Sequence, residues 1–300
     1  MITAIHRGVD DASPSERTAR EAPPAIRVEH LTHVYPRGQV VALKDVSFTI
    51  EPGEAVGIVG QNGSGKTTLA KHFNALLKPT SGRVLIEGEE TTDKRVQQLA
   101  AKVGYVFQNP NHQLFASTVE EDLAFGPRNL GLTDEEVRDR VEEAIAFFGL
   151  ESVRTLHPYR ISFPMRKLVG IAGIYAMRPS IFVLDEPTTG QDHVTTRIIN
   201  GLIRRLRDQG ATVICVSHDM PLLADVVDRI LVMWNAQLIA DDSPRVIFAN
   251  GEVMARTKLR PPQITEIALR LNNGRTLPVA LSVAELAQAL ARELEQGARA

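Results

Sequence analysis

The sequence predicts an α/β fold, in which a twisted sheet is flanked by helices. Short apolar runs, which are typical of buried parallel strands, recur along the 300 residues. Stretches with apolar residues at helical spacing separate several of these runs. A glycine-rich segment also joins one apolar strand directly to an amphipathic helix, a connection found in many open α/β sheets.

The composition fits one large domain, or one domain with a small appendage, with enough chain to bury a core. The formal net charge is −2, and the chain has only four Tyr and one Trp. Direct work on DNA or RNA is therefore disfavoured, because it calls for a basic face or a platform of stacking aromatic residues. The single cysteine, Cys215, lies in an apolar run and is predicted to be a core residue of a reduced cytosolic protein, not a reactive thiol.

Residues 1–25 are polar, lack the apolar run of a signal peptide and are predicted to form a disordered leader. No window reaches the roughly 18 apolar residues that span a bilayer, so we expect any membrane role to need a separate subunit. Residues 26–50 alternate in polarity, with Val46, Phe48 and Ile50 on one face. This pattern predicts antiparallel strands that end at Pro52 and Gly53.

A phosphate-binding loop follows, between an apolar strand at 55–59 and a helix whose apolar face includes Leu69 and Phe73. Glycines let backbone N–H groups turn inward around phosphate oxygens, and the positive end of the helix faces them. In this pattern Lys66 would reach the β- and γ-phosphates, and the Thr67 hydroxyl would hold Mg²⁺. The sequence therefore predicts a site for ATP and Mg²⁺ made by Gly60, Gln61, Asn62, Gly63, Ser64, Gly65, Lys66, Thr67 and Thr68.

Further strands are predicted at residues 83–87, 102–108, 180–185, 212–217 and 229–234. Residues 109–176 have a mainly helical pattern, and we expect an inserted helical subdomain there. Thr133 and Glu136 form a capping box at the start of one of its helices. After residue 240 the periodicity weakens. One short helix from Ser282 is predicted, suited to packing on the core or on a second copy.

Two strand ends carry further chemical groups. The apolar strand at 181–184 delivers Asp185 and Glu186 at its carboxyl end, where ligands of open α/β sheets bind. Successive side chains point apart, so we expect Asp185 to complete the Mg²⁺ shell and Glu186 to polarise the water that attacks the γ-phosphorus. His218 ends another strand at the same edge, where its imidazole would hydrogen-bond a γ-phosphate oxygen. Solvated or capping positions are expected for His6, His72, His112 and His157.

In their order these motifs resemble the nucleotide-binding subunit of an ATP-binding cassette (ABC) transporter, from about residue 26 to 242. The implied fold is an α/β P-loop NTPase (RecA-like) core with an antiparallel β subdomain, an inserted helical subdomain and a short C-terminal α-rich tail at 243–300. The resemblance implies that Tyr35 stacks on adenine, that Gln108 of the Gln loop joins the catalytic and metal-binding groups, and that Asp192 is the D-loop aspartate. His218 matches the switch histidine. Taken singly, Tyr35 and Gln108 leave a purely structural role open.

A narrower resemblance is to the energy-coupling factor group, which imports vitamins and transition metals. It rests on residues 108–122 (QNPNHQLFASTVEED), on residues 124–127 (AFGP) and on residues 259–265 in the tail. In such importers two ATPase subunits at the cytoplasmic face of the cell membrane drive an integral membrane scaffold (T component) and a substrate-capture (S) component. The scaffold's helices dock near the Gln loop. Leu114 and Phe115 are candidates for the docking surface, with ordinary packing of the helical subdomain as the alternative.

One segment departs from the family pattern. The ABC signature, normally Leu-Ser-Gly-Gly-Gln, aligns with Ile-Ser-Phe-Pro-Met at 161–165, where only Ser162 is kept. In the family this segment caps a helix and reaches the partner's ATP. Ser162 can still cap and Pro164 suits a first helical turn, but Pro164 donates no hydrogen bond and Phe163 crowds the approach. We hypothesise an asymmetric heterodimer, in which this chain completes one site and weakens the other. A homodimer that uses this sequence normally is the alternative.

The leading function is thus ATP hydrolysis that powers micronutrient uptake. A soluble ABC ATPase acting on DNA or ribosomes is the alternative from another class, but such proteins usually carry a long coiled coil or a second cassette, and the sequence has neither. The ATPase of another ABC transporter type is a further alternative. A regulatory nucleotide-binding module without turnover is disfavoured by Glu186 and His218.

Overall fold

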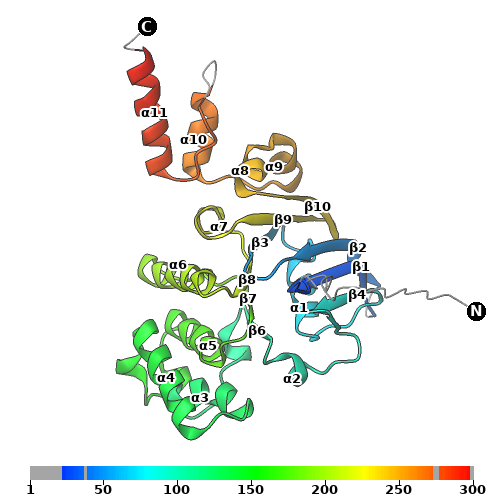
Figure 1. Ribbon diagram of the computed structural model, residues 1–300, viewed down its shortest axis with the longest axis vertical. Helices are drawn as coiled ribbons and strands as arrows, with labels where there is room; N and C mark the ends of the chain where they lie inside the picture. The colour runs from blue at the N-terminus through cyan, green and yellow to red at the C-terminus, as the bar shows by residue number, and fades with distance from the viewer. Residues whose placement is uncertain (1–21, 37–38, 273–276, 298–300) are drawn as a thin grey trace, which may run out of the picture.

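The computed structural model describes residues 22–36, 39–272 and 277–297. Most of the predicted leader, residues 1–21, lies outside this range. Two sheets form the centre of the described chain, with helices around them (Figure 1). Ala25, at the end of the predicted leader, is buried, and its carbonyl oxygen accepts a hydrogen bond from the Glu87 N–H at 3.0 Å.

The smaller sheet has the strand order β2-β1-β4-β5. Its strands are β1 (Ile26–Tyr35), β2 (Val40–Ile50), β4 (Ser81–Ile86) and β5 (Glu89–Glu90). The predicted antiparallel pairing of residues 26–50 is confirmed, with Ile26 opposite Ile50. Val46, Phe48 and Ile50 are all buried, as their alternation predicts.

The larger sheet has the order β10-β9-β3-β8-β7-β6. Five strands are parallel, and β10 adds an antiparallel edge. They span β3 (Ala55–Gly60), β6 (Val103–Val106), β7 (Ile181–Asp185), β8 (Thr212–Val216), β9 (Arg229–Trp234) and β10 (Gln237–Asp242). The predicted strands match β3, β4, β6, β7, β8 and β9 to within two residues at each end, while β5 and β10 were not predicted. The predicted α/β class is confirmed.

Alternate residues of each central strand enter two different cores. Val56 and Ile58 of β3 pack with the smaller sheet and with α1 (Lys66–Phe73). Ala55 and Val59 of the same strand pack on the opposite face, against the helical layer. The sheet is therefore covered on both sides, which accounts for its continuous apolar strands. Cys215 is fully buried in the second core, as predicted, and burial raises the pKa of its thiol.

Helices cover the second face and extend beyond one end of the sheet (Figure 1). Between β6 and β7 the chain forms η1 (Pro110–His112), α3 (Val119–Asn129), α4 (Asp134–Phe148), η2 (Glu151–Val153), η3 (Pro158–Arg160) and α5 (Phe163–Met177). The capping box of Thr133 and Glu136 is present at the start of α4, and Gly149 ends that helix in the left-handed conformation. The remaining helices of this part are α2 (Val96–Leu99), α6 (His193–Asp208) and α7 (Met220–Val226).

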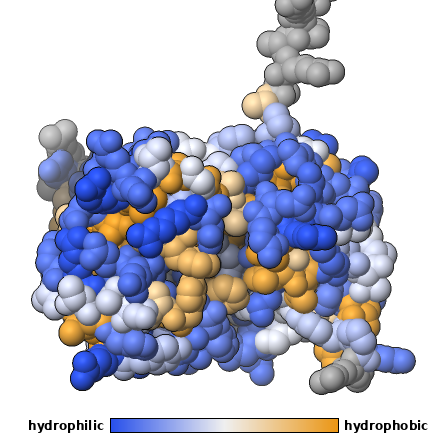
Figure 2. Space-filling model, turned by 90° about the horizontal axis from the view of Figure 1, so that it is seen from below, coloured by the Kyte–Doolittle hydropathy of each residue, from blue (hydrophilic) through white to orange (hydrophobic). Residues whose placement is uncertain are grey.

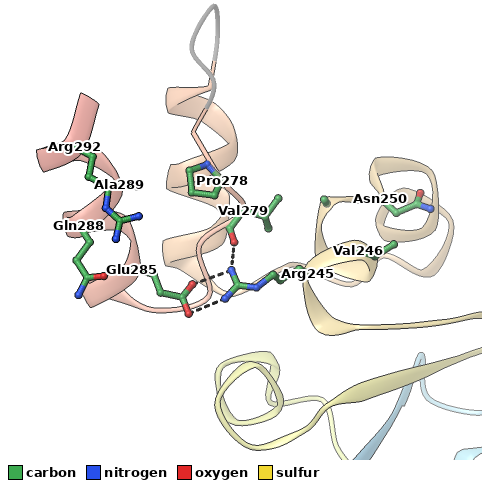
Figure 3. Close-up of a pocket in the computed structure, with 10 residues that line it drawn as sticks. Arg245, Val246, Asn250, Pro278, Val279, Glu285, Gln288, Ala289 and Arg292 are labelled. Carbon is green, nitrogen blue, oxygen red and sulfur yellow. Dashed lines mark hydrogen bonds and ion pairs between the residues drawn. The ribbon is translucent and has the colours of Figure 1, made fainter. Parts of the chain in front are cut away.

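The C-terminal part contains more helix than the sequence analysis predicts. It forms α8 (Pro244–Ala249), α9 (Gly251–Thr257), α10 (Gln263–Leu271) and α11 (Val283–Gly297), at the opposite end of the molecule from α3 and α4 (Figure 1). Only α11 was predicted, because α8, α9 and α10 have 6, 7 and 9 residues, too few for a clear periodic signal. Arg245 on α8 holds the segment before α11 in place. Its guanidinium donates to both carboxylate oxygens of Glu285 at 2.9 Å and to the Val279 carbonyl, beside a cavity of about 770 Å³ (Figure 3).

Across the described residues, no helix combines the length and the apolar character that crossing a membrane requires.

Phe148 offers a test of the helical packing. It is 1 % exposed, and its ring lies 5.7 Å from that of Tyr175 on α5. We expect Phe148→Ala to lower the free energy of unfolding by about 3–5 kcal/mol, because it leaves a cavity between α4 and α5. Phe115→Ala is the matched control, since Phe115 is 61 % exposed. Its cost should stay below about 1 kcal/mol in the same denaturant titration. Equal losses from both variants would contradict this packing.

Candidate functional site

The predicted phosphate loop lies between β3 and α1, with Gly60 and Gly65 in backbone conformations that exclude other residues. Both have positive φ, at 148° and 103°. A Cβ at Gly60 would lie 2.1 Å from the Met233 carbonyl oxygen, and one at Gly65 would lie 2.3 Å from that of Ala42. Only glycine fits such approaches. The loop is thus tightly folded against β9 and β2.

Lys66 opens α1 and is 8 % exposed. Its ammonium donates to the carbonyl oxygens of Gly60 at 2.8 Å and Gln61 at 2.9 Å. Burial lowers the pKa of Lys66, although the nearby carboxylates of Glu186 and Asp185 oppose that shift. The ammonium is therefore held at the mouth of the loop, where it can face phosphate oxygens.

Thr67 and Asp185 meet across the loop, as a shared role at a metal requires. The Thr67 hydroxyl donates to Asp185 Oδ1 at 3.3 Å, and the Tyr105 hydroxyl donates to Oδ2 at 2.9 Å. Burial raises the pKa of Asp185, while its hydrogen bonds to Tyr105 and Thr67 oppose the shift. Hydroxyl and carboxylate oxygens are the ligands that Mg²⁺ takes, so this pair fits the ion. The sequence analysis missed Tyr105, whose position in an apolar strand gives no sign of a polar contact.

Glu186 and His218 are brought together at the ends of β7 and β8. His218 Nδ1 lies 2.7 Å from Glu186 Oε2, and the Thr189 hydroxyl donates to the same oxygen at 3.0 Å. The Glu186 side chain is 11 % exposed and that of His218 is 65 % exposed. The carboxylate is thus fixed in place while the imidazole faces solvent. A histidine that touches the carboxylate was not predicted, since the expected partner was a phosphate oxygen.

A cavity of about 310 Å³ is lined by Lys66, Thr67 and Glu186, whereas Asp185 and His218 lie behind or beside these residues and do not line it. Tyr35 lies on its wall, and the Tyr35 hydroxyl is 3.2 Å from Thr68 Oγ1. Of the predicted residues, the cavity wall includes Tyr35, Asn62, Gly63, Gly65, Lys66, Thr67, Thr68, Gln108 and Glu186. Ser64 Oγ is buried in the loop and has no hydrogen-bond partner among the described residues. The narrow polar cradle and this free hydroxyl both fit a phosphate chain.

Ser162 and Asp192 do not line this cavity. Each caps a helix: Ser162 Oγ accepts from the Met165 N–H at 3.5 Å at the start of α5, and Asp192 Oδ1 accepts from the Thr195 N–H at 2.7 Å at the start of α6. The predicted cap by Ser162, with Pro164 in the first turn, is confirmed.

The comparisons with known proteins agree with this geometry. A model of the ABC transporter family matches residues 43–189. The energy-coupling factor transporter ATP-binding protein EcfA of Methanoculleus marisnigri is 42 % identical over 257 residues, covering 85 % of this chain and 92 % of that protein. The chain belongs to the ATP-binding proteins of energy-coupling factor (ECF) transporters. The resemblance inferred from the motifs is confirmed, and with it the P-loop NTPase core.

Other relatives give the same assignment. EcfA of Methanocaldococcus jannaschii is 40 % identical over 256 residues, covering 85 % of this chain and 91 % of that protein. The solved structure of cbiO1 from Clostridium perfringens, described as part of the ABC transporter complex cbiONQ, has a TM-score of 0.68 and 35 % identity and covers 82 % of this chain and 98 % of that one. This ECF ATPase therefore binds and hydrolyses ATP, and the transport assignment is favoured over the soluble alternatives.

His72 corrects one expectation of the sequence analysis. It is fully buried rather than solvated. Its Nδ1 lies 2.7 Å from the Thr68 carbonyl oxygen and its Nε2 lies 3.2 Å from His33 Nδ1. Burial lowers the pKa of His72 to about 4. The sequence analysis did not place position 72 on the apolar face of α1, because a histidine does not mark a core position. In the structure His72 of α1 packs against His33 of β1, where an aliphatic contact would be usual.

His72 should make stability depend on pH. Its folded pKa of about 4 lies below the unfolded value of 6.5, so the unfolded chain binds the proton more readily between these values. The stabilisation is complete above pH 6.5 and is lost as the pH falls towards 4, by about 2 kcal/mol between pH 7 and pH 5. Denaturant titrations at both pH values should show a smaller difference in His72→Gln. His30→Gln is the control, because His30 is exposed. The same slope in His72→Gln as in the wild type would exclude this origin.

Proposed function

We propose that this ECF ATPase powers the import of a micronutrient, a vitamin or a transition metal, from the cytoplasmic face of the cell membrane. In this assembly it pairs with a second ATPase subunit and acts on a T component, with an S component that captures the substrate. The observation that carries the proposal is the convergence of Lys66, Asp185, Glu186 and His218 on one edge of the sheet, as a turnover-competent site requires.

Each residue has a distinct task in hydrolysis. Lys66 binds the β- and γ-phosphates, and Tyr35 on the cavity wall stacks on adenine. Thr67, Asp185 and Gln108 would hold Mg²⁺, which neutralises charge on the phosphates. Glu186 accepts a proton from the attacking water, since its carboxylate is fixed beside the cavity. His218 contacts Glu186 through Nδ1, which leaves Nε2 for a γ-phosphate oxygen.

The second ATPase subunit completes the site. Ser162 and Asp192 lie outside this chain's own cavity, so we infer that they serve the nucleotide of the partner. Pro164 in the first turn of α5 has no N–H to offer. This supports the asymmetric heterodimer, in which the partner serves this chain's ATP better than this chain serves the partner's. A homodimer is the alternative. The two arrangements differ in how much the catalytic carboxylate of each subunit contributes to ATP turnover.

Substitution of Glu186 tests both the function and the asymmetry. With the partner ATPase and the T component present, Glu186→Gln should lower ATP turnover by at least about a hundredfold, because it removes the base. The equivalent change in the partner should cost much less. Glu135→Gln, at an exposed position on α4, is the control. Equal losses from the two subunits, or full activity of this chain alone, would contradict the heterodimer. Unchanged turnover in Glu186→Gln would contradict the proposed role of Glu186.

The T component is proposed to dock in a groove of about 600 Å³ between α2, α3 and α5. Phe115 and Phe125 border it, 61 % and 48 % exposed, with their rings edge to face at 4.6 Å. Apolar side chains gather around a hollow on this end of the molecule (Figure 2). Leu114 also lines the groove but is buried, so only Phe115 of the two predicted residues presents a large exposed surface. An amphipathic helix of the scaffold suits such a groove.

Gln113 connects this groove to the ATP site. Its Nε2 donates to the Gly170 carbonyl at 2.6 Å, and its Oε1 accepts from the Phe107 N–H at 3.4 Å, next to Gln108. A helix seated in the groove would therefore press on a side chain that contacts both α5 and the Gln loop. This path supports the coupling of docking to hydrolysis.

Removing the aromatic border of the groove tests the docking site. The double variant Phe115→Ala/Phe125→Ala should keep its ATP affinity but lose most co-purification with the T component and the stimulation of turnover that it gives. Val246→Ala on α8, also an exposed apolar residue, is the control. Normal co-purification of the double variant would place the docking surface elsewhere.

A further inference from the structure

Lys167 is a buried lysine that the hydrolytic steps above do not use. It lies in the second turn of α5 and is 1 % exposed. Its ammonium donates to the carbonyl oxygen of Glu186 and, at 3.1 Å, to that of Thr189. None of the ion pairs found among the described residues includes it. A buried ammonium without a carboxylate in contact is costly. Its hydrogen bonds to these two carbonyls and its attraction to the nearby carboxylates of Glu186 and Asp185 compensate for that cost.

The two carbonyls belong to the residues that set the catalytic carboxylate. Glu186 has a φ of 52°, a left-handed conformation that is unfavourable for a residue with a side chain, and it precedes a proline. Its N–H donates to the Val216 carbonyl at 2.8 Å, and its carbonyl accepts from Lys167. Thr189, the other acceptor, donates its hydroxyl to the Glu186 carboxylate. Lys167 thus holds both the backbone of Glu186 and the residue that orients its side chain.

The same lysine is attached to the altered signature segment. Ser162 caps α5, and Phe163, the first residue of the helix, lies close to the D-loop: a Cβ at Gly190 would be 3.6 Å from its ring. Lys167 follows one turn later on the same rigid helix. A shift of the start of α5 would therefore move the ammonium relative to the turn at 186–189.

We propose that Lys167 is a positioning residue that ties the signature end of α5 to the Glu186–Thr189 turn, so that engagement of one nucleotide site adjusts the carboxylate of the other. The coupling between the two nucleotide sites rests on the dimer of the proposed function. The positioning of Glu186 rests on contacts within this chain alone. Burial lowers the pKa of Lys167 to about 8, with Glu186 and Asp185 opposing the shift, so the group is mainly a cation at neutral pH.

The kinetic test uses the full chain assembled with its partner ATPase and T component. We expect Lys167→Met to lower kcat about tenfold to a hundredfold, the loss of charge-assisted hydrogen bonds, while the affinity for ATP changes less than about twofold. Lys167→Gln keeps an uncharged N–H donor group and should recover part of kcat. Lys102→Met is the control, since Lys102 pairs with Glu87 and Glu89 at the surface. A wild-type kcat in Lys167→Met, or an equal loss of ATP affinity and kcat, would overturn the proposal.

Hydrogen exchange supplies a second test that needs no turnover. In the nucleotide-free chain, Lys167→Met and Lys167→Gln should speed exchange of the amides at 186–191, where the Gln191 N–H donates to the Thr188 carbonyl. Exchange at 60–68 and in Lys102→Met should match the wild type. Unchanged exchange at 186–191 in both Lys167 variants would overturn the proposal even if ATP hydrolysis stands. Loss of turnover in Glu186→Gln with wild-type behaviour of Lys167→Met would refute the positioning role and leave the proposed function intact.

Discussion

Asp185 in β7 pairs with Val216 in β8, and this parallel register sets the geometry of the whole site. The pairing continues past the strand ends, because the Glu186 N–H donates to the Val216 carbonyl and the Ser217 N–H donates to the Ile58 carbonyl in β3. These hydrogen bonds fix the register of β7, β8 and β3 relative to one another at their carboxyl ends. A slip by one residue would turn Asp185 away from Thr67 and separate Glu186 from His218.

Charge balance is the second condition for this arrangement. Lys66, Lys167, Asp185 and Glu186 are all buried. Burial lowers the pKa of each lysine, and the two carboxylates oppose that shift in both cases. In a low-dielectric interior these mutual attractions offset much of the desolvation cost. The four groups act as one unit, so a change in any of them alters the electrostatic setting of the others.

The sequence predicts the parts of the site that are local and fails where distant elements meet. The glycine loop, the carboxyl ends of the strands and the caps at Thr133 and Ser162 depend on spacing within a few residues, and each lies where expected. The Tyr105 hydroxyl and its acceptor Asp185 are 80 residues apart in sequence, and the paired His72 and His33 are 39 apart. Local patterns give no sign of such contacts. In the tail, α8 and α9 are too short for periodicity to mark them.

The altered signature leaves the helix intact while it removes donors from the end of that helix. An α-helix presents unpaired N–H groups in its first turn, and these bind anions. In α5 the second position is Pro164, which has no N–H, and the third N–H, that of Met165, is taken by Ser162 Oγ. The Arg166 N–H already donates to the Ser162 carbonyl.

Among these first-turn positions, only the N–H of Phe163 remains for a phosphate, and the Phe163 ring lies against the D-loop. The Ser162 hydroxyl oxygen accepts from the Met165 N–H, so this side chain can offer a phosphate only its own O–H. The segment therefore keeps the structural half of its role, which is to start α5 and to set Lys167 against the Glu186 turn. Its anion-binding half is reduced to about one backbone donor. That imbalance is the physical basis for expecting this ECF ATPase to act with a partner whose signature segment is complete.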